Sequence, residues 1–78
     1  MQTDKDLSRL VRSLRGRLGL TQERFAVKLG VTFASVNRWE NGRARPSRLA
    51  MRQIEEQLRQ MGDQGADLLD EYFPEPEF

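Results

Sequence analysis

Residues 21–45 of this 78-residue chain include several side chains that can bind an anionic partner. They are carboxamides and guanidinium groups, which donate hydrogen bonds to phosphates and carboxylates, and a guanidinium can donate two in parallel. The chain has neither histidine nor cysteine, so it lacks the commonest general base, the commonest metal ligands and disulfides. We also find no paired-carboxylate arrangement and no phosphate-cradling glycine loop. We therefore expect no enzyme, no metal and no cofactor.

Two short amphipathic segments, residues 21–29 and 32–41, carry most of these side chains. Each opens with a threonine that can cap a helix, and each is followed by a glycine, Gly30 or Gly42, that can take the left-handed conformation past a helix end. Only two residues separate the segments. The pattern predicts two short helices joined by a tight corner, which is the geometry of a helix-turn-helix, and the second helix of that unit usually reads the DNA major groove.

Three further helices are predicted around this pair. An apolar stripe at steps of three and four residues predicts a helix over residues 4–18. After the Asn-Gly and Pro of the following loop, Ser47 can cap a helix over residues 48–61. Gly62 and Gly65 interrupt the pattern, and a short fifth helix is expected over residues 66–73, ended by prolines at 74 and 76. The apolar residues of the first stripe are Leu7, Leu10, Val11, Leu14 and Leu18.

Charge divides the chain into two parts. Residues 1–60 hold all 13 Lys and Arg and six acids, which gives +7, whereas residues 61–78 hold six acids and no base, which gives −6. A basic body suits a polyanion, although a solvated basic surface is common too. We expect a domain at residues 1–61 and an acidic tail at residues 62–78. The tail can be disordered, fold back on the bundle or pair two subunits, or compete with DNA for the basic face.

The runs LRGRLGLTQERFAVKLGV and SVNRWENGRARPS resemble the Cro/C1-type (XRE-like) helix-turn-helix family over residues 7–58. The resemblance rests on "LTQ" opening the second helix, "LGV" at the corner and "WENG" after the third helix, all at family spacing. It implies an all-α fold, a compact bundle of four to five short helices of the lambda-repressor-like type. Leu29, Val36 and Trp39 are expected in its core, and Ala26 where the second and third helices cross closely.

The resemblance also implies how the chain contacts double-stranded DNA. The outer face of the third helix reaches base edges, and Arg38 is the first choice because a guanidinium can bond guanine O6 and N7. Phe33 departs from the polar residue common in the family, so it either packs on a thymine methyl or folds back onto the domain. The base-reading residues are expected to be Phe33, Ala34, Asn37 and Arg38. The phosphate-binding residues are expected to be Thr21, Gln22, Ser35, Asn41, Arg43 and Arg45, helped by backbone amides after the third helix.

A structural ion pair between Arg15 and Glu40 is also implied by the resemblance, and it would fix the third helix relative to the first. We expect a transcriptional regulator, most readily a repressor that binds a palindromic site as a homodimer. The alternatives are an antitoxin that also represses its operon, and an interaction module that binds a protein partner through the acidic tail. No apolar run reaches membrane-spanning length and no signal peptide is seen, so the expected location is the cytoplasm, at the nucleoid, with no membrane partner.

Overall fold

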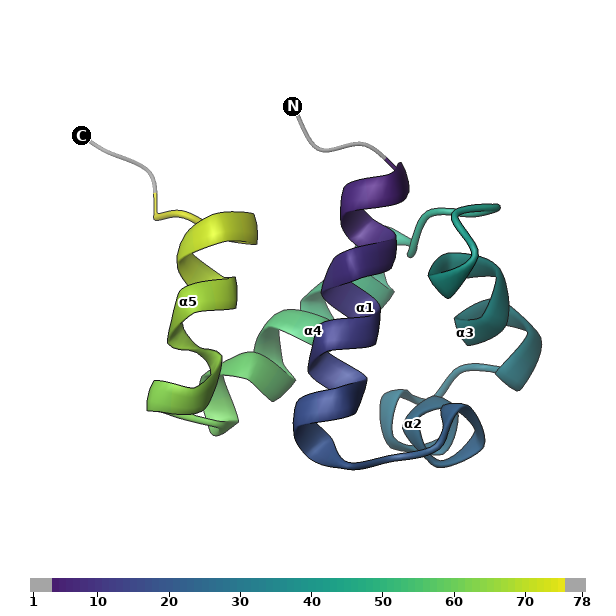
Figure 1. Ribbon diagram of the computed structural model, residues 1–78, viewed down its shortest axis with the longest axis horizontal. Helices are drawn as coiled ribbons and strands as arrows, with labels where there is room; N and C mark the ends of the chain where they lie inside the picture. The colour runs from purple at the N-terminus through teal and green to yellow at the C-terminus, as the bar shows by residue number, and fades with distance from the viewer. Residues whose placement is uncertain (1–3, 76–78) are drawn as a thin grey trace.

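Five helices and no strand make up residues 4–75, the part of the chain that this computed structural model describes. The all-α bundle expected from the sequence is confirmed. Pro76, expected to help end the last helix, lies outside the described residues. In chain order the helices are α1 (Asp4–Leu18), α2 (Gln22–Leu29), α3 (Phe33–Glu40), α4 (Arg48–Gln60) and α5 (Asp63–Tyr72), as Figure 1 shows.

The corner between α2 and α3 follows directly from the local sequence. Thr21 accepts a hydrogen bond from the Arg24 amide at 3.2 Å, and Thr32 accepts one from the Ser35 amide at 3.1 Å. Both threonines are therefore caps that lie outside their helices, which begin one residue later than the sequence predicted. Gly30 ends α2 in the left-handed conformation, with φ of 73°. A side chain with a Cβ adopts that conformation at a cost, so glycine suits this corner.

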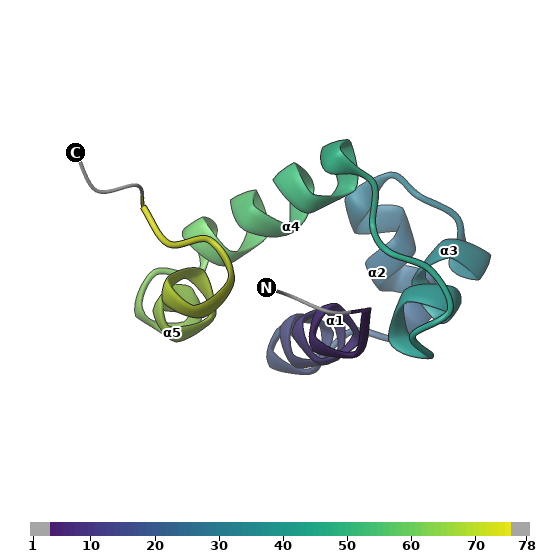
Figure 2. The same cartoon turned by 90° about the horizontal axis from the view of Figure 1, so that it is seen from above.

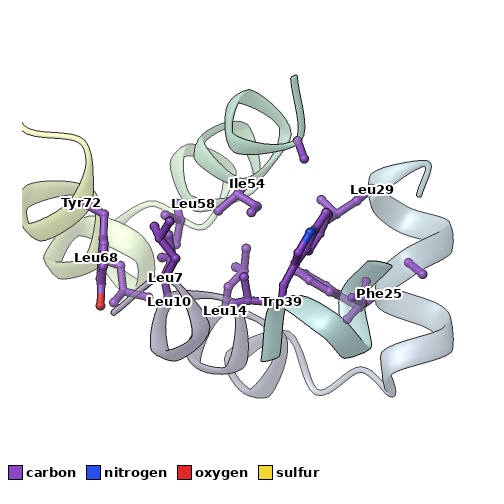
Figure 3. Packing of buried hydrophobic residues seen from close by; sticks show 14 residues of the cluster. Leu7, Leu10, Leu14, Phe25, Leu29, Trp39, Ile54, Leu58, Leu68 and Tyr72 are labelled. Atoms are coloured by element: carbon purple, nitrogen blue, oxygen red, sulfur yellow. The ribbon is translucent and has the colours of Figure 1, made fainter. Parts of the chain in front are cut away.

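One hydrophobic core joins all five helices (Figure 3). Leu10 and Leu14 of α1, Phe25 of α2, and Ile54 and Leu58 of α4 are fully enclosed. Trp39 contributes its ring from α3 and lies between α1 and α2 in this view, with 6% of its surface exposed. Trp39 is therefore a core residue, as the sequence predicted.

Helix α5 completes the core from the C-terminal side. It begins at Asp63, three residues before the predicted start, and it includes Gly65. A Cβ on Gly65 would lie 2.3 Å from the carbonyl oxygen of Leu58, so glycine permits the close approach of α5 to the end of α4. Leu68 and Tyr72 then enter the core with 4% and 6% of their surface exposed. Residues 63–72 thus fold back onto the bundle.

Two acidic residues of α5, Asp67 and Glu71, pair with arginines of α1. Arg17 and Asp67 form two parallel hydrogen bonds of 2.6 and 2.8 Å, and Arg9 pairs with Glu71. The Arg17 hydrogen bonds lower the pKa of Asp67 to about 2. Tyr72 donates to the Asp6 carbonyl at 2.9 Å. These contacts hold α5 on the side of α1 that lies away from α2 and α3, as both views of the molecule show (Figures 1 and 2).

Candidate nucleic-acid interface

Helix α3 has one buried face and one exposed face. Val36 is fully buried and Trp39 nearly so, whereas Phe33 has 49% of its surface exposed and Ala34 and Arg38 are also exposed. Phe33 does not belong to the core or to the apolar residues packed against it. Phe33 was expected either to pack on a thymine methyl or to fold back onto the domain, and the structure shows that it does not fold back. The outer face of α3 therefore presents one guanidinium, one aromatic ring and one methyl group.

Arg15 and Glu40 join the end of α1 to the end of α3. The Arg15 Nε and Nη2 atoms donate to the two carboxylate oxygens of Glu40 at 2.6 and 2.9 Å. The Glu40 side chain is only 4% exposed and that of Arg15 is 27% exposed. Burial disfavours the ionised carboxylate, but hydrogen bonds from Arg15 and Gln22 outweigh it, so the pKa of Glu40 lies below its ordinary value. Glu40 is thus ionised at neutral pH and fixes α3 against α1.

Two further residues of α1 hold the same end of α3, and the sequence did not reveal them. The Ser8 hydroxyl donates to the Glu40 carbonyl at 2.6 Å, and Arg12 Nη2 donates to the same oxygen at 2.7 Å. The last carbonyls of a helix have no hydrogen-bond partner within it, and a cation at that end also interacts favourably with the helix dipole. Ser8, Arg12 and Arg15 follow each other at steps of four and three residues, so they form a polar stripe beside the apolar one. That stripe is the signal by which they could have been found.

Gln22, at the start of α2, contacts α3 through both ends of its carboxamide. Its Nε2 donates to Glu40 Oε1 at 3.1 Å, and its Oε1 accepts from Asn37 Nδ2 at 3.2 Å. Asn37 Oδ1 in turn accepts from Asn41 Nδ2 at 3.2 Å. Asn37 is half-buried, unlike the other three expected base readers, which are exposed. The structure therefore groups Asn37 with Gln22 and Asn41.

In the loop after α3, the side chains are more available to a ligand than the backbone amides are. The Gly42 amide donates to the Trp39 carbonyl at 3.2 Å and the Arg43 amide to the Arg38 carbonyl at 2.9 Å. Gly42 has φ of 70°, so these two bonds form a glycine-based helix end of the Schellman type. The backbone amides of these two residues are used within the chain, although the family resemblance implied that amides here bind phosphate. The side chains of Asn41, Arg43 and Arg45 are exposed.

Thr21 and Ser35 have local partners beside any contact with a ligand. Thr21 is exposed and caps α2. Ser35 is half-buried, and its hydroxyl accepts from the Thr32 hydroxyl at 2.9 Å. Both residues nevertheless lie in the first turn of a helix or next to it, where backbone N–H groups and the helix dipole favour an anion. The helix starts of α2 and α3 are therefore compatible with phosphate contacts.

No group of three or more acidic side chains that could hold a metal ion is found in residues 4–75. None of the helices α1–α5 is long and apolar enough to cross a membrane.

A family model described as helix-turn-helix matches residues 11–60, from the middle of α1 to the end of α4. This stretch includes α2, α3 and the loop after α3, and it covers more than half of the chain. Neither the curated proteins nor the solved structures give a significant match.

Proposed function

The chain belongs to the Cro/C1-type helix-turn-helix family, a family of DNA-binding regulators of transcription, and from this premise we propose that it is a sequence-specific repressor. In this proposal α3 lies in the major groove and α2 crosses the DNA backbone. Arg38 reads a base edge, and Phe33 and Ala34 make apolar contacts with neighbouring bases. The observation that carries the proposal is the division of α3 into a buried face and an exposed face led by Arg38.

The proposed contacts with the phosphates of the DNA backbone lie on either side of this reading face. Thr21, Gln22 and Ser35 lie at the starts of α2 and α3, and Arg43 and Arg45 lie in the loop beyond the end of α3. Contacts from the two sides of a helix in the groove would position it without reading sequence. Residues 1–60 hold 13 Lys and Arg but only six acids, and this excess of positive charge favours binding to DNA.

We propose a homodimer as the DNA-bound form. A single short helix contacts few base pairs, and a two-fold symmetric dimer on a palindromic site places two such helices one helical turn apart, about 34 Å. A protein that acts on DNA in this way works in the cytoplasm, at the nucleoid.

The competing proposal is a protein-interaction module with the same fold, of which an antitoxin that binds a toxin is one form. The exposed acidic residues of α5 favour it, since they offer a charged surface away from the reading face. A titration with random duplex DNA at low salt separates the two proposals. Binding that weakens steeply with added salt supports the DNA-binding regulator, and the absence of any binding supports the interaction module.

The role of Arg38 is tested by Arg38→Ala. We expect a loss of about 1–3 kcal/mol on the preferred duplex and a weaker preference over scrambled duplex. Arg59→Ala is the matched control, because it removes the same charge from the far end of α4, where Arg59 pairs with Glu55. Equal discrimination by the Arg38→Ala protein and the wild type would contradict base reading by Arg38.

A further inference from the structure

Three carboxamides and one carboxylate form a single row of hydrogen bonds across the candidate interface. The row runs from Glu40 to Gln22, from Gln22 to Asn37 and from Asn37 to Asn41, with heavy-atom distances of 3.1, 3.2 and 3.2 Å. It links the start of α2 to the end of α3 and to the first residue of the following loop. Asn37 is the only one of these amides that contacts both of the others, so it is the centre of the row.

The carboxylate sets the direction of every amide in the row. An ionised carboxylate only accepts hydrogen bonds, so Gln22 must turn its Nε2 toward Glu40 and its Oε1 toward Asn37. Asn37 must then donate with Nδ2, which leaves its Oδ1 to accept from Asn41. Reversing any one amide would place two donors or two acceptors against each other. Ionised Glu40, held by Arg15, therefore specifies the orientation of all three amides.

Each amide nitrogen carries two N–H groups, and the row uses one of them on Gln22 and one on Asn41. No partner of the second N–H of either amide is found in residues 4–75, and in this inference that N–H is the donor to a ligand. Gln22 on α2 and Asn41 after α3 both belong to the phosphate-binding set that the family resemblance implied. Since both amides are fixed by Asn37, their remaining donors are oriented before any ligand arrives, which reduces the side-chain ordering that binding requires.

Asn37 itself is poorly disposed to read a base. Recognition of adenine by asparagine uses both the amide oxygen and the amide nitrogen. In the structure its oxygen is held by Asn41 and its nitrogen by Gln22, and the side chain is half-buried. Turning Asn37 to a base would leave the Gln22 oxygen and an Asn41 N–H without these partners.

We propose that Asn37 is a positioning residue, which holds Gln22 and Asn41 ready for two phosphates of the DNA backbone and does not read sequence. The proposal rests on the DNA-binding function proposed above and goes beyond it by giving Asn37 a role different from the base reading that the family resemblance implied.

The variant Asn37→Ala tests the proposal on DNA. We expect its affinity to fall by about three- to tenfold, the size of a lost hydrogen bond, by the same factor on the preferred duplex and on each of its single-base variants. Gln22→Ala should then cost less in the Asn37→Ala background than in the wild type, because the two residues act together. A changed preference at one base position, or strictly additive effects of the two substitutions, would overturn the proposal.

The same row can be tested without DNA. Side-chain amide signals in the NMR spectrum of the free protein should move for Gln22 and Asn41 in Asn37→Ala, while Arg38→Ala leaves both in place. Asn37→Asp keeps the acceptor for Asn41 but removes the donor to Gln22. In this variant the Gln22 signal should therefore move further than the Asn41 signal. Unmoved signals in a folded Asn37→Ala protein would overturn the positioning role. Failure of the wild type to bind DNA would instead overturn the proposed function, and it is seen before any variant is made.

Discussion

Replacing Glu40 by alanine tests how α3 is held in place. The substitution removes the carboxylate that receives two hydrogen bonds from Arg15 and one from Gln22. It leaves the Glu40 backbone carbonyl with its donors Ser8 and Arg12. The change therefore isolates the side-chain contacts of Glu40 from the backbone contacts at the same helix end.

The magnitude follows from the burial of the two partners. Removing one partner of a fully buried ion pair costs about 3–5 kcal/mol. The Arg15 side chain is 27% exposed, so water can reach its guanidinium after the substitution. We therefore expect a loss of about 2–3 kcal/mol in the free energy of unfolding. In a domain of this size that corresponds to a fall of about 8–24 °C in melting temperature.

Thermal and urea unfolding followed by circular dichroism or Trp39 fluorescence measure this loss. Glu55→Ala is the matched control, because Glu55 pairs with Arg59 on the surface of α4 and such a pair contributes about 0.5 kcal/mol or less. DNA affinity should fall together with stability only in Glu40→Ala. A Glu40→Ala protein with the melting temperature and the DNA affinity of the wild type would refute the role of the pair.

The pH dependence of the same contact has a definite sign. The pKa of Glu40 in the folded protein lies below its ordinary value of 4.5, so ionised Glu40 stabilises the fold above that value. The stabilisation is lost as the pH falls through the folded pKa. The difference in unfolding free energy between wild type and Glu40→Gln should be largest near neutral pH and should shrink below pH 4.5. A difference that grows toward acid pH would contradict the sign of the shift.

Two further substitutions test the phosphate contact of Arg43 and the close approach of α5 to α4 at Gly65. Arg43→Ala should weaken binding to all duplexes alike and reduce the slope of log affinity against log salt by about one. The control Arg59→Ala should leave that slope unchanged. Equal slopes for both variants and the wild type would exclude a phosphate contact by Arg43. Gly65→Ala should destabilise the protein by about 1–3 kcal/mol because its methyl group meets the Leu58 carbonyl. The control Gly16→Ala has no neighbour within 4 Å and lies inside α1, so it should stabilise by about 0.5–1 kcal/mol; equal melting temperatures of the two variants would contradict this explanation of Gly65.

The local signals in the sequence were sufficient for the helix-turn-helix and for its core. Thr21, Thr32 and Ser47 lie directly before α2, α3 and α4 and accept the expected capping hydrogen bonds. Helix capping depends on neighbours within four residues, so sequence alone specifies it. Gly30 shows the same for a helix end.

Helix α5 was harder to predict because its start depends on another helix. Gly65 reads as a helix breaker from sequence, but it lies inside α5 because the end of α4 approaches it closely. The partners of Arg9 and Arg17 were likewise unpredictable, since they come from α5, more than 45 residues away in the chain. Such contacts follow from tertiary packing, and a single sequence contains no local sign of them.

The residues of the candidate site divide in the same way. The family resemblance assigned both Arg38 and Asn37 to the reading face, and the guanidinium made Arg38 the first choice. The partners of Asn37 are Gln22 on α2 and Asn41 after α3. The contact with Gln22 depends on the packing of α2 on α3, so a single sequence does not show it.

In the proposed function, the exposed face of α3 reads a DNA sequence. The direct test is selection of bound sites from a random duplex library, with the wild type and Arg38→Ala in parallel. The wild type should enrich a palindromic site whose half-sites lie about 34 Å apart, and Arg38→Ala should lose the preference at one base pair in each half-site. A wild-type protein that binds the library without enriching any sequence would refute base reading by α3.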